Sequence, residues 1–230
     1  VEYLKAPSDS VKVSLFNDLA NLDLVYTPRF DADRFVSGRR LSYWNSSLGR
    51  RAGRDAIIDP LRRDKWFKDD EVAGRVHRNI GTFEVAGYFY DGFWKTPEGK
   101  DLGSGRARYP ELSVYGASIR GPVFGGIGNA EVAYYDSKED PGGDDFTVRN
   151  SETRFLLGYE KEAARNLTVG VQYYLEYMSH YDSYKDTLPA GNHPKDHDRH
   201  VLTLRCTQLL LNQDLELSLF TYYSPSDNDA

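Results

Sequence analysis

The chain has 230 residues, which is enough for one domain, taken here as 1–230. Its net charge is −6, from 29 basic and 35 acidic residues, so it lacks the basic surplus of nucleic-acid-binding proteins, and we expect no nucleic-acid partner. Mean hydropathy is −0.62. No apolar run approaches the roughly 18 residues of a membrane helix. A search for long apolar runs does not detect the strands of a membrane barrel, because only every second residue faces lipid.

About ten segments of alternating apolar and polar residues follow one another and predict β-strands. Their apolar positions are, in chain order, Val11, Val13 and Leu15; Leu22 and Leu24; Val72 and Val76; Phe83, Val85 and Phe89; Ala130, Val132 and Tyr134; Phe155 and Leu157; Leu202 and Leu204; and Leu215, Leu217 and Leu219. The segment 111–119 is less regular, because both of its sides carry small or apolar residues. The clearest segment is 167–177, which is long enough to cross a bilayer when tilted near 45°.

The joints between these segments alternate strictly between short and long. The short joints are 17–21, 79–82, 121–128, 163–166 and 210–214, and the long polar ones are near 31–69, 91–109, 137–150 and 179–198. Short turns on one rim and long loops on the other are typical of outer-membrane barrels. We therefore predict an all-β fold: an antiparallel up-and-down transmembrane β-barrel in a bacterial outer membrane. A soluble sandwich or barrel with one wet face is the alternative.

Aromatic residues gather beside the long loops and predict a girdle at one membrane interface. They are Tyr88, Phe89, Tyr90, Phe93, Trp94, Tyr134, Tyr135, Tyr173, Tyr174, Tyr177, Phe220, Tyr222 and Tyr223.

The ends of the chain support a further expectation. Counting the predicted strands from the short joints places both chain ends on the long-loop rim, whereas a complete barrel normally starts and ends on the short-turn side. We therefore expect a central part of a larger barrel, with a closed ten-strand barrel as the alternative.

Several stretches resemble an uncharacterised group of porin-like bacterial outer-membrane barrels. They are Arg78-Asn-Ile-Gly-Thr-Phe-Glu-Val-Ala-Gly-Tyr, Val114-Tyr-Gly-Ala-Ser-Ile-Arg-Gly-Pro, Asn129-Ala-Glu-Val-Ala-Tyr-Tyr-Asp-Ser, Asp144-Asp, Arg149-Asn-Ser-Glu and 204–225. The resemblance covers nearly the whole chain and implies the fold, the location and further strands on both sides of this sequence. It implies no substrate and no catalytic residues.

Charged residues occupy the polar side of the predicted strands. The candidates for lining a lumen are Arg75, Glu84, Glu131, Glu152, Arg154, Glu176, Arg205 and Glu216. Arginine or lysine facing lipid near the midplane costs about 2–4 kcal/mol, so these side chains are expected to face inward as a ladder of ion pairs. The ladder either stiffens the wall or sets the charge preference of a pore, and its mixed signs argue against strong ion selectivity.

The loop 39–68 is rich in arginine and is the best candidate for a constriction inside the lumen. Its candidate residues are Arg50, Arg51, Arg54, Arg62 and Arg63. The same guanidinium groups also suit lipopolysaccharide phosphates, and a plain surface loop is the alternative.

Other motifs carry weaker signals. The acidic loop 136–145 does not have EF-hand spacing, and the histidines of 180–200 match no tight metal or protease motif, so no metal, cofactor or catalytic residue is expected. Cys206 lies in a strand pattern as a small wall residue.

These patterns together predict a porin-like channel for passive passage of small polar solutes and not an enzyme. The bilayer and lipopolysaccharide are the expected partners, together with a possible protein partner or oligomer. The alternatives are a structural or partner-holding barrel without an open pore and, third, an outer-membrane enzyme, which would need a Ser/His or Asp/His pair in its loops.

Overall fold

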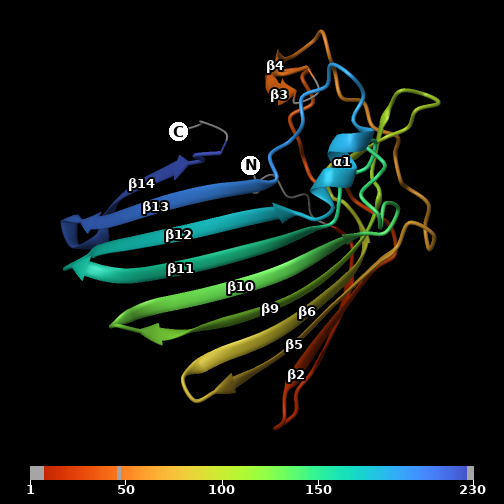
Figure 1. Ribbon diagram of the computed structural model, residues 1–230. Helices are drawn as coiled ribbons and strands as arrows, with labels where there is room; N and C mark the ends of the chain where they lie inside the picture. Colours follow the sequence, from red (N-terminus) through yellow and green to blue (C-terminus); the bar gives the residue numbers. More distant parts are fainter. Residues whose placement is uncertain (1–7, 46–47, 227–230) are drawn as a thin grey trace.

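A computed structural model, which describes residues 8–45 and 48–226, contains one ten-stranded antiparallel sheet (Figure 1). Its strands, in both chain and sheet order, are β1 (Val11–Leu15), β2 (Asn21–Thr27), β5 (Glu71–Ile80), β6 (Phe83–Phe93), β9 (Glu111–Val123), β10 (Gly126–Ser137), β11 (Glu152–Ala164), β12 (Leu167–Met178), β13 (Asp198–Leu210) and β14 (Leu215–Tyr223). The prediction of an all-β, up-and-down antiparallel fold is confirmed.

Smaller elements lie in the connections between these strands. They are the hairpins β3 (Tyr43–Asn45) with β4 (Arg50–Ala52) and β7 (Gly99–Lys100) with β8 (Ala107–Arg108), the helix α1 (Tyr181–Thr187) and the 3-10 turn η1 (Leu211–Gln213). Among the described residues, no helix is long and apolar enough to cross a membrane.

The alternation of short turns and long loops is also confirmed. Short turns join β5 to β6, β9 to β10, and β11 to β12 at one end of the sheet, here called the turn rim. Phe124 and Gly125 between β9 and β10 have φ values of 48° and 75°, as a tight hairpin that follows the strand twist requires. All long connections gather at the opposite end, the long-loop rim (Figure 1).

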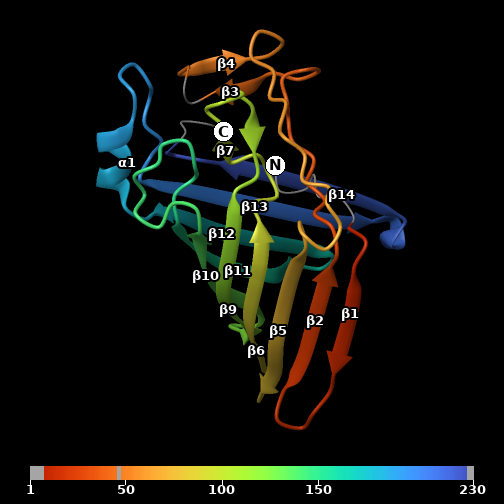
Figure 2. The same ribbon diagram turned by 90° about the vertical axis from the view of Figure 1, so that its right-hand side faces the viewer.

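The alternative of a closed ten-strand barrel is not met by the described residues, because the sheet is open. It bends into a trough (Figure 2), but its two outer strands do not come together. β1 pairs only with β2, and β14 pairs only with β13. The curvature of ten strands therefore leaves one free strand edge on each side.

The strand register separates the side chains into two chemically distinct faces. One row across the sheet joins Leu22, Val76, Gly87, Ala117, Val132, Phe155 and Leu175. The neighbouring row joins Asp23, Arg75, Tyr88, Gly116, Ala133, Arg154, Glu176 and Arg199. Because alternate strand residues point to opposite sides, the first row belongs to an apolar face and the second to a polar face, the inner side of the trough.

The buried apolar core is very small for a chain of this length. One cluster, Phe30, Phe93 and Tyr109, lies at the long-loop rim, where the loops fold over the polar face. On the apolar face, by contrast, Val76, Leu157 and Val171 are 48–52% exposed, and within the described chain the long strands pack against no helix or strand other than their sheet neighbours and the turn η1. At the rim the His197 ring lies 4.5 Å from that of Tyr177, but no described helix or further sheet packs over the middle of this face.

The predicted single aromatic girdle is wrong in part, because neighbouring aromatic residues point to opposite faces. Phe89, Tyr115 and Tyr134 lie in one row of the apolar face near the long-loop rim, and the rings of Phe89 and Tyr115 are 5.7 Å apart. Tyr90 and Tyr135 belong to the polar face instead, as do Tyr88, Tyr174, Phe220 and Tyr222 by the strand register. Period-two alternation separates each Tyr-Tyr pair, so only part of the set can form an outward belt.

Candidate functional site

The polar face carries charged residues at similar depth on neighbouring strands. The register places all eight predicted lining residues on this one face. Arg75 and Glu84 form an ion pair of 2.7 Å between β5 and β6. Glu131 has no ion-pair partner among the described residues, and Glu216 accepts a hydrogen bond from Ser218.

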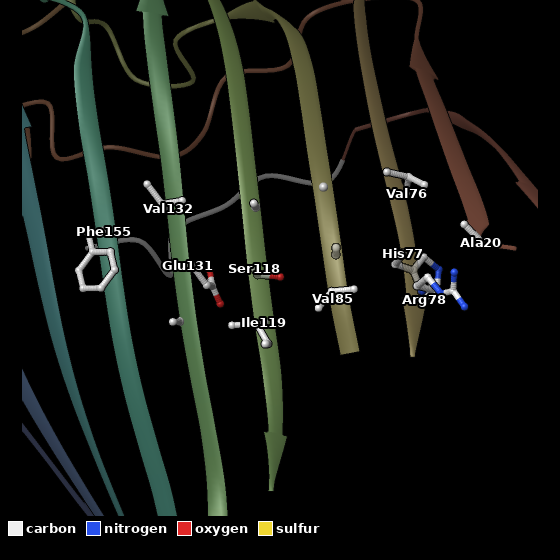
Figure 3. Close-up of a pocket in the computed structure, with 14 residues that line it drawn as sticks. Ala20, Val76, His77, Arg78, Val85, Ser118, Ile119, Glu131, Val132 and Phe155 are labelled. Atoms are coloured by element: carbon white, nitrogen blue, oxygen red, sulfur yellow. The ribbon is translucent and has the colours of Figure 1, made fainter. Parts of the chain in front are cut away.

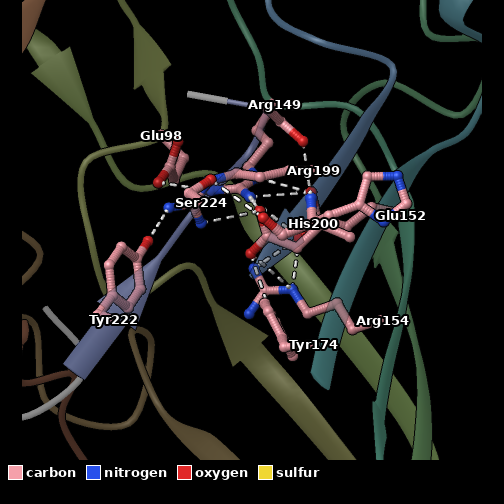
Figure 4. A network of polar contacts seen from close by, with 11 residues as sticks. Glu98, Arg149, Glu152, Arg154, Tyr174, Arg199, His200, Tyr222 and Ser224 are labelled. Atoms are coloured by element: carbon pink, nitrogen blue, oxygen red, sulfur yellow. Dashed lines mark hydrogen bonds and ion pairs between the residues drawn. The ribbon is translucent and has the colours of Figure 1, made fainter. Parts of the chain in front are cut away.

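A continuous network of ion pairs joins the loops of the long-loop rim to the polar face of the sheet, and we call it the ion-pair belt (Figure 4). Its members are Glu98, Arg149, Glu152, Arg154, Glu176 and Arg199. Of these, sequence reasoning identified Glu152, Arg154 and Glu176.

Arg149 is the centre of the ion-pair belt. Its guanidinium lies 2.9 Å from a carboxylate oxygen of Glu98 and 2.9 Å from one of Glu152, and 3.9 Å from Glu176. Glu152 also accepts a hydrogen bond from Nε of Arg154 at 2.6 Å, and Nη2 of Arg154 lies 2.5 Å from the same oxygen. The Glu152 side chain is only 5% exposed. A buried carboxylate held by two guanidinium groups fixes the start of β11 to the loop before it.

Aromatic rings surround the belt and limit its contact with water. The Arg154 guanidinium lies 3.9 Å from the ring centre of Tyr135, and the Arg149 guanidinium lies 4.8 Å from that of Trp94. Tyr135 and Trp94 stack on each other at 5.7 Å. These cation–π contacts strengthen the attachment of the loops, because both cations are largely removed from solvent.

Charge pairing sets the ionisation of Glu98. Burial opposes its charged form, but the nearby charges of Arg149 and Lys195, with hydrogen bonds from Thr96 and Arg149, outweigh burial and lower the pKa of Glu98 to about 2. The carboxylates of Glu98, Glu152 and Glu176 in turn raise the pKa of Arg149 against its own burial. Both groups are therefore charged at neutral pH.

Acid is expected to loosen this attachment. A carboxyl whose pKa falls on folding stabilises the fold above its unfolded pKa, near 4.5, and loses that contribution as the pH falls towards the folded value near 2. We expect Glu98 to lose roughly 2–3 kcal/mol over this interval, seen as a change in tryptophan fluorescence on acid titration. The variant Glu98→Gln should be less stable at pH 7 and should lack this part of the transition. An unchanged titration in that variant would show that Glu98 does not contribute.

The long loops form one connected assembly at the rim. Arg63 Nε donates to the carbonyl of Tyr109 at 2.8 Å, and its guanidinium lies 4.1 Å from the ring centre of Phe93. Arg63 also pairs with Asp69 at 3.4 Å and with Glu139 at 3.8 Å. One arginine thus links the loops 28–70, 94–110 and 138–151.

The other predicted constriction arginines behave differently from Arg63. Arg50 pairs with Asp55 at 2.8 Å. Arg51, Arg54 and Arg62 are exposed and have no ion-pair partner among the described residues. Of the five arginines, Arg63 therefore forms an ion pair with another loop, and the other four form none within the part of the chain that the structure describes.

A second buried ion pair lies where β5 and β6 reach the rim. Lys95 contacts Glu71 at 2.5 Å, and the Tyr90 hydroxyl donates to the other oxygen of Glu71 at 2.5 Å. The Glu71 side chain is 4% exposed. Together with the ion-pair belt, this contact fixes the loops to the polar face on both halves of the sheet.

The apolar face contains a shallow depression of about 550 Å³ (Figure 3). Its floor consists of the small residues Gly87, Ala117 and Ala130, and Val76, Val132 and Phe155 are among the larger side chains around it. The lining is almost entirely apolar, so it offers no chemistry to a polar solute. A smaller recess of about 200 Å³ on the polar face is bordered by Arg205, Glu160 and Thr168.

The histidine-rich segment holds one hydrogen-bonded chain on the apolar face. The Tyr173 hydroxyl lies 2.7 Å from Nδ1 of His200, and Nε2 of His200 lies 2.9 Å from Asp198. An Asp/His pair is thus present, with a tyrosine rather than a serine as third member, but it lies on β13 and not in a loop, where the enzyme alternative needed it. Within the described residues, no group of three or more His, Cys, Asp or Glu side chains is placed to hold a metal ion.

Sequence reasoning missed Glu98, Arg149, Arg199 and the cluster of Glu71 and Lys95. Arg149 and Glu152 are three residues apart, which is a local signal for a pair. Glu98 lies 51 residues before Arg149 in the sequence, and no pattern in the chain indicates that contact.

These features define the protein as a single-layer antiparallel β-protein with one charged, loop-covered face and one exposed apolar face. Comparison with protein-family models, with curated proteins and with solved structures found no match for this chain. The resemblance to porin-like barrels therefore stays a prediction.

Proposed function

We propose that this chain forms the wall of a β-barrel in a bacterial outer membrane and that the barrel is a porin-like channel for passive passage of small polar solutes. The observation that carries the proposal is the two-faced single sheet. A soluble protein of this size would bury an extended apolar face against a second layer, since large exposed apolar patches are uncommon on monomers. A bilayer supplies the missing apolar contact.

The polar face supports the channel part of the proposal. Its charges are of both signs and lie on the inner side of the trough, where water replaces lipid. Arg75 with Glu84, and Arg154 with Glu152, compensate each other in pairs. Glu131 and Arg205, which form no ion pair with any residue in 8–45 and 48–226, remain available to interact with a passing solute. This arrangement suits a hydrated path without strong ion selectivity.

The two free strand edges also bear on the proposal. In hydrocarbon, every backbone donor and acceptor needs a partner, so an open sheet edge is not tolerated there. We propose that strand pairing across β1 and β14 completes the wall in the membrane. Bilayer lipids, with lipopolysaccharide in the outer leaflet, then surround the apolar face.

The loop assembly favours a second candidate function, a barrel closed by its own loops that holds a partner or has a structural role. The ion-pair belt and the Glu71–Lys95 pair fix the loops over the polar face, which is how a lumen becomes plugged. An enzyme using Tyr173, His200 and Asp198 ranks third, because these residues lie on the sheet's apolar face without a polar cleft around them.

Single-channel recording tests the channel proposal directly. We expect the purified protein to produce discrete conductance steps in planar lipid bilayers, above the background of lipid and detergent alone. Membrane insertion without any conductance would contradict the channel and favour the plugged barrel. The inserted fraction, measured by flotation with liposomes, separates these two results from a failure to insert.

A further inference from the structure

The loop 28–70 has the opposite charge to the rest of the protein. It contains eleven arginine and lysine residues against seven aspartates, whereas the whole chain has a net charge of −6. Within this loop, the β3–β4 hairpin stands above the long-loop rim, away from the sheet (Figures 1 and 2). An exposed basic element on an acidic protein attracts anions towards that place.

The hairpin has one packed face and one free face. Tyr43 and Ala52 pair across its strands; Ala52 is buried, and the Tyr43 hydroxyl donates to the carbonyl of Ala56 at 2.7 Å. Trp44 and Arg51 form the next pair and therefore lie together on the opposite face. Trp44 is 66% exposed, so an indole ring and a guanidinium are both open to solvent.

The same part of the loop carries further cations. A Cβ built on Gly38 would lie 2.6 Å from the carbonyl oxygen of Gly53, so the segment leading to Arg40 runs beside the one that carries Arg51 and Arg54. Arg40, Arg51 and Arg54 are exposed, and no described carboxylate pairs with them. Their neighbours are engaged elsewhere: Arg39 pairs with Asp59 at 3.5 Å, and Arg50 pairs with Asp55 at 2.8 Å.

Other loops hold the hairpin in place. A Cβ on Gly49 in its turn would lie 2.5 Å from the His193 ring, so the loop 179–197 touches the hairpin. Arg106 reaches Asp59 at 3.0 Å from the loop 94–110. The free face is thus presented by a braced element at the end of the trough where a solute would enter.

We propose that the free face of this hairpin binds phosphorylated sugars at the channel entrance. Guanidinium groups bind phosphate through paired charge-assisted hydrogen bonds, and an exposed indole offers a flat apolar surface to a sugar ring. Arg51 and Arg54, with Arg40, receive the phosphate, and Trp44 stacks on the ring. This inference rests on the proposed channel, because it names the class of solute that the channel takes up.

Binding is tested in detergent, where no channel activity is needed. The probe is glucose 6-phosphate, compared with glucose and inorganic phosphate by isothermal titration calorimetry at low salt. We expect the double variant Arg51→Gln/Arg54→Gln to weaken glucose 6-phosphate binding at least tenfold. The control Arg78→Gln/Arg165→Gln removes the same charge from exposed arginines near the turn rim and should change it less than twofold.

The tryptophan has its own matched control. Trp44→Ala should reduce the affinity for glucose 6-phosphate to that for inorganic phosphate, whereas Trp66→Ala, at another exposed indole of the same loop, should not. Equal losses in the hairpin and control arginine variants would overturn the proposal, since only overall charge would then matter. Absence of glucose 6-phosphate binding, or arginine-dependent binding confined to phosphorylated glycolipid micelles, would overturn it as well.

The two proposals fail separately. A protein that conducts but does not bind glucose 6-phosphate refutes the sugar-phosphate site alone. A protein that binds it through Arg51 and Arg54 but never conducts refutes the channel and leaves the binding site standing.

Discussion

Replacing Val171 by arginine is expected to destabilise the protein in a bilayer by about 2–4 kcal/mol, because the charge would enter the hydrocarbon region. Val171 lies near the middle of β12 on the apolar face, where it is 48% exposed. The neighbouring substitution Gln172→Arg places the same side chain on the polar face. We expect it to change the free energy of unfolding by less than about 0.5 kcal/mol.

The comparison of these two variants separates membrane from soluble folding. Reversible unfolding in denaturant, with lipid vesicles present, measures both free energies on the same strand. In a soluble protein, an arginine at half-exposed Val171 would be harmless, since its charge would reach water. Equal stability of the two variants would therefore contradict the membrane orientation of the sheet.

Replacing Arg149 by alanine is expected to have the largest effect of any charge deletion in the ion-pair belt, about 3–5 kcal/mol. The change removes the cation shared by Glu98, Glu152 and Glu176 and leaves Glu152, which is 5% exposed, with fewer compensating charges. We expect release of the loops 94–110 and 138–151 from the wall. Their faster cleavage by protease and a change in tryptophan fluorescence, as Trp94 loses the nearer of its two cations, would report this release.

Two further variants control for the loss of charge at Arg149. Arg165→Ala removes an exposed arginine in the turn between β11 and β12 and should cost less than about 0.5 kcal/mol. Arg149→Lys keeps the charge but loses the double contact with Glu152, so an intermediate loss is expected. If Arg149→Ala is no more destabilising than Arg165→Ala, the ion-pair belt does not hold the loops.

The strands and their faces could be predicted from sequence because both are local properties. The alternation in 167–177 corresponds to β12 within one residue, and Phe124 with Gly125 forms the tight turn expected between two strand patterns. The shared face of the eight charged candidates followed from the same period of two, which needs no knowledge of distant contacts.

The remaining features depend on contacts between distant segments or on the whole sheet. The pairing of Arg149 with Glu98 requires two loops to fold over the same strands, and the period of two does not describe loops. The β3–β4 hairpin was missed because three-residue strands are too short to show alternation. Whether the sheet closes into a barrel depends on the curvature summed over all its strands, which the residue pattern of a single strand does not indicate.

The directions of the two outer strands restrict how the proposed barrel could be completed. β1 runs from the long-loop rim to the turn rim, whereas β14 runs the opposite way. Any added strand must be antiparallel to both of its neighbours if the ladder is to stay uniform. A single insertion between β14 and β1 cannot satisfy both, so only direct pairing or an even number of inserted strands preserves the pattern. A uniformly antiparallel barrel built from this sheet would therefore have an even total number of strands.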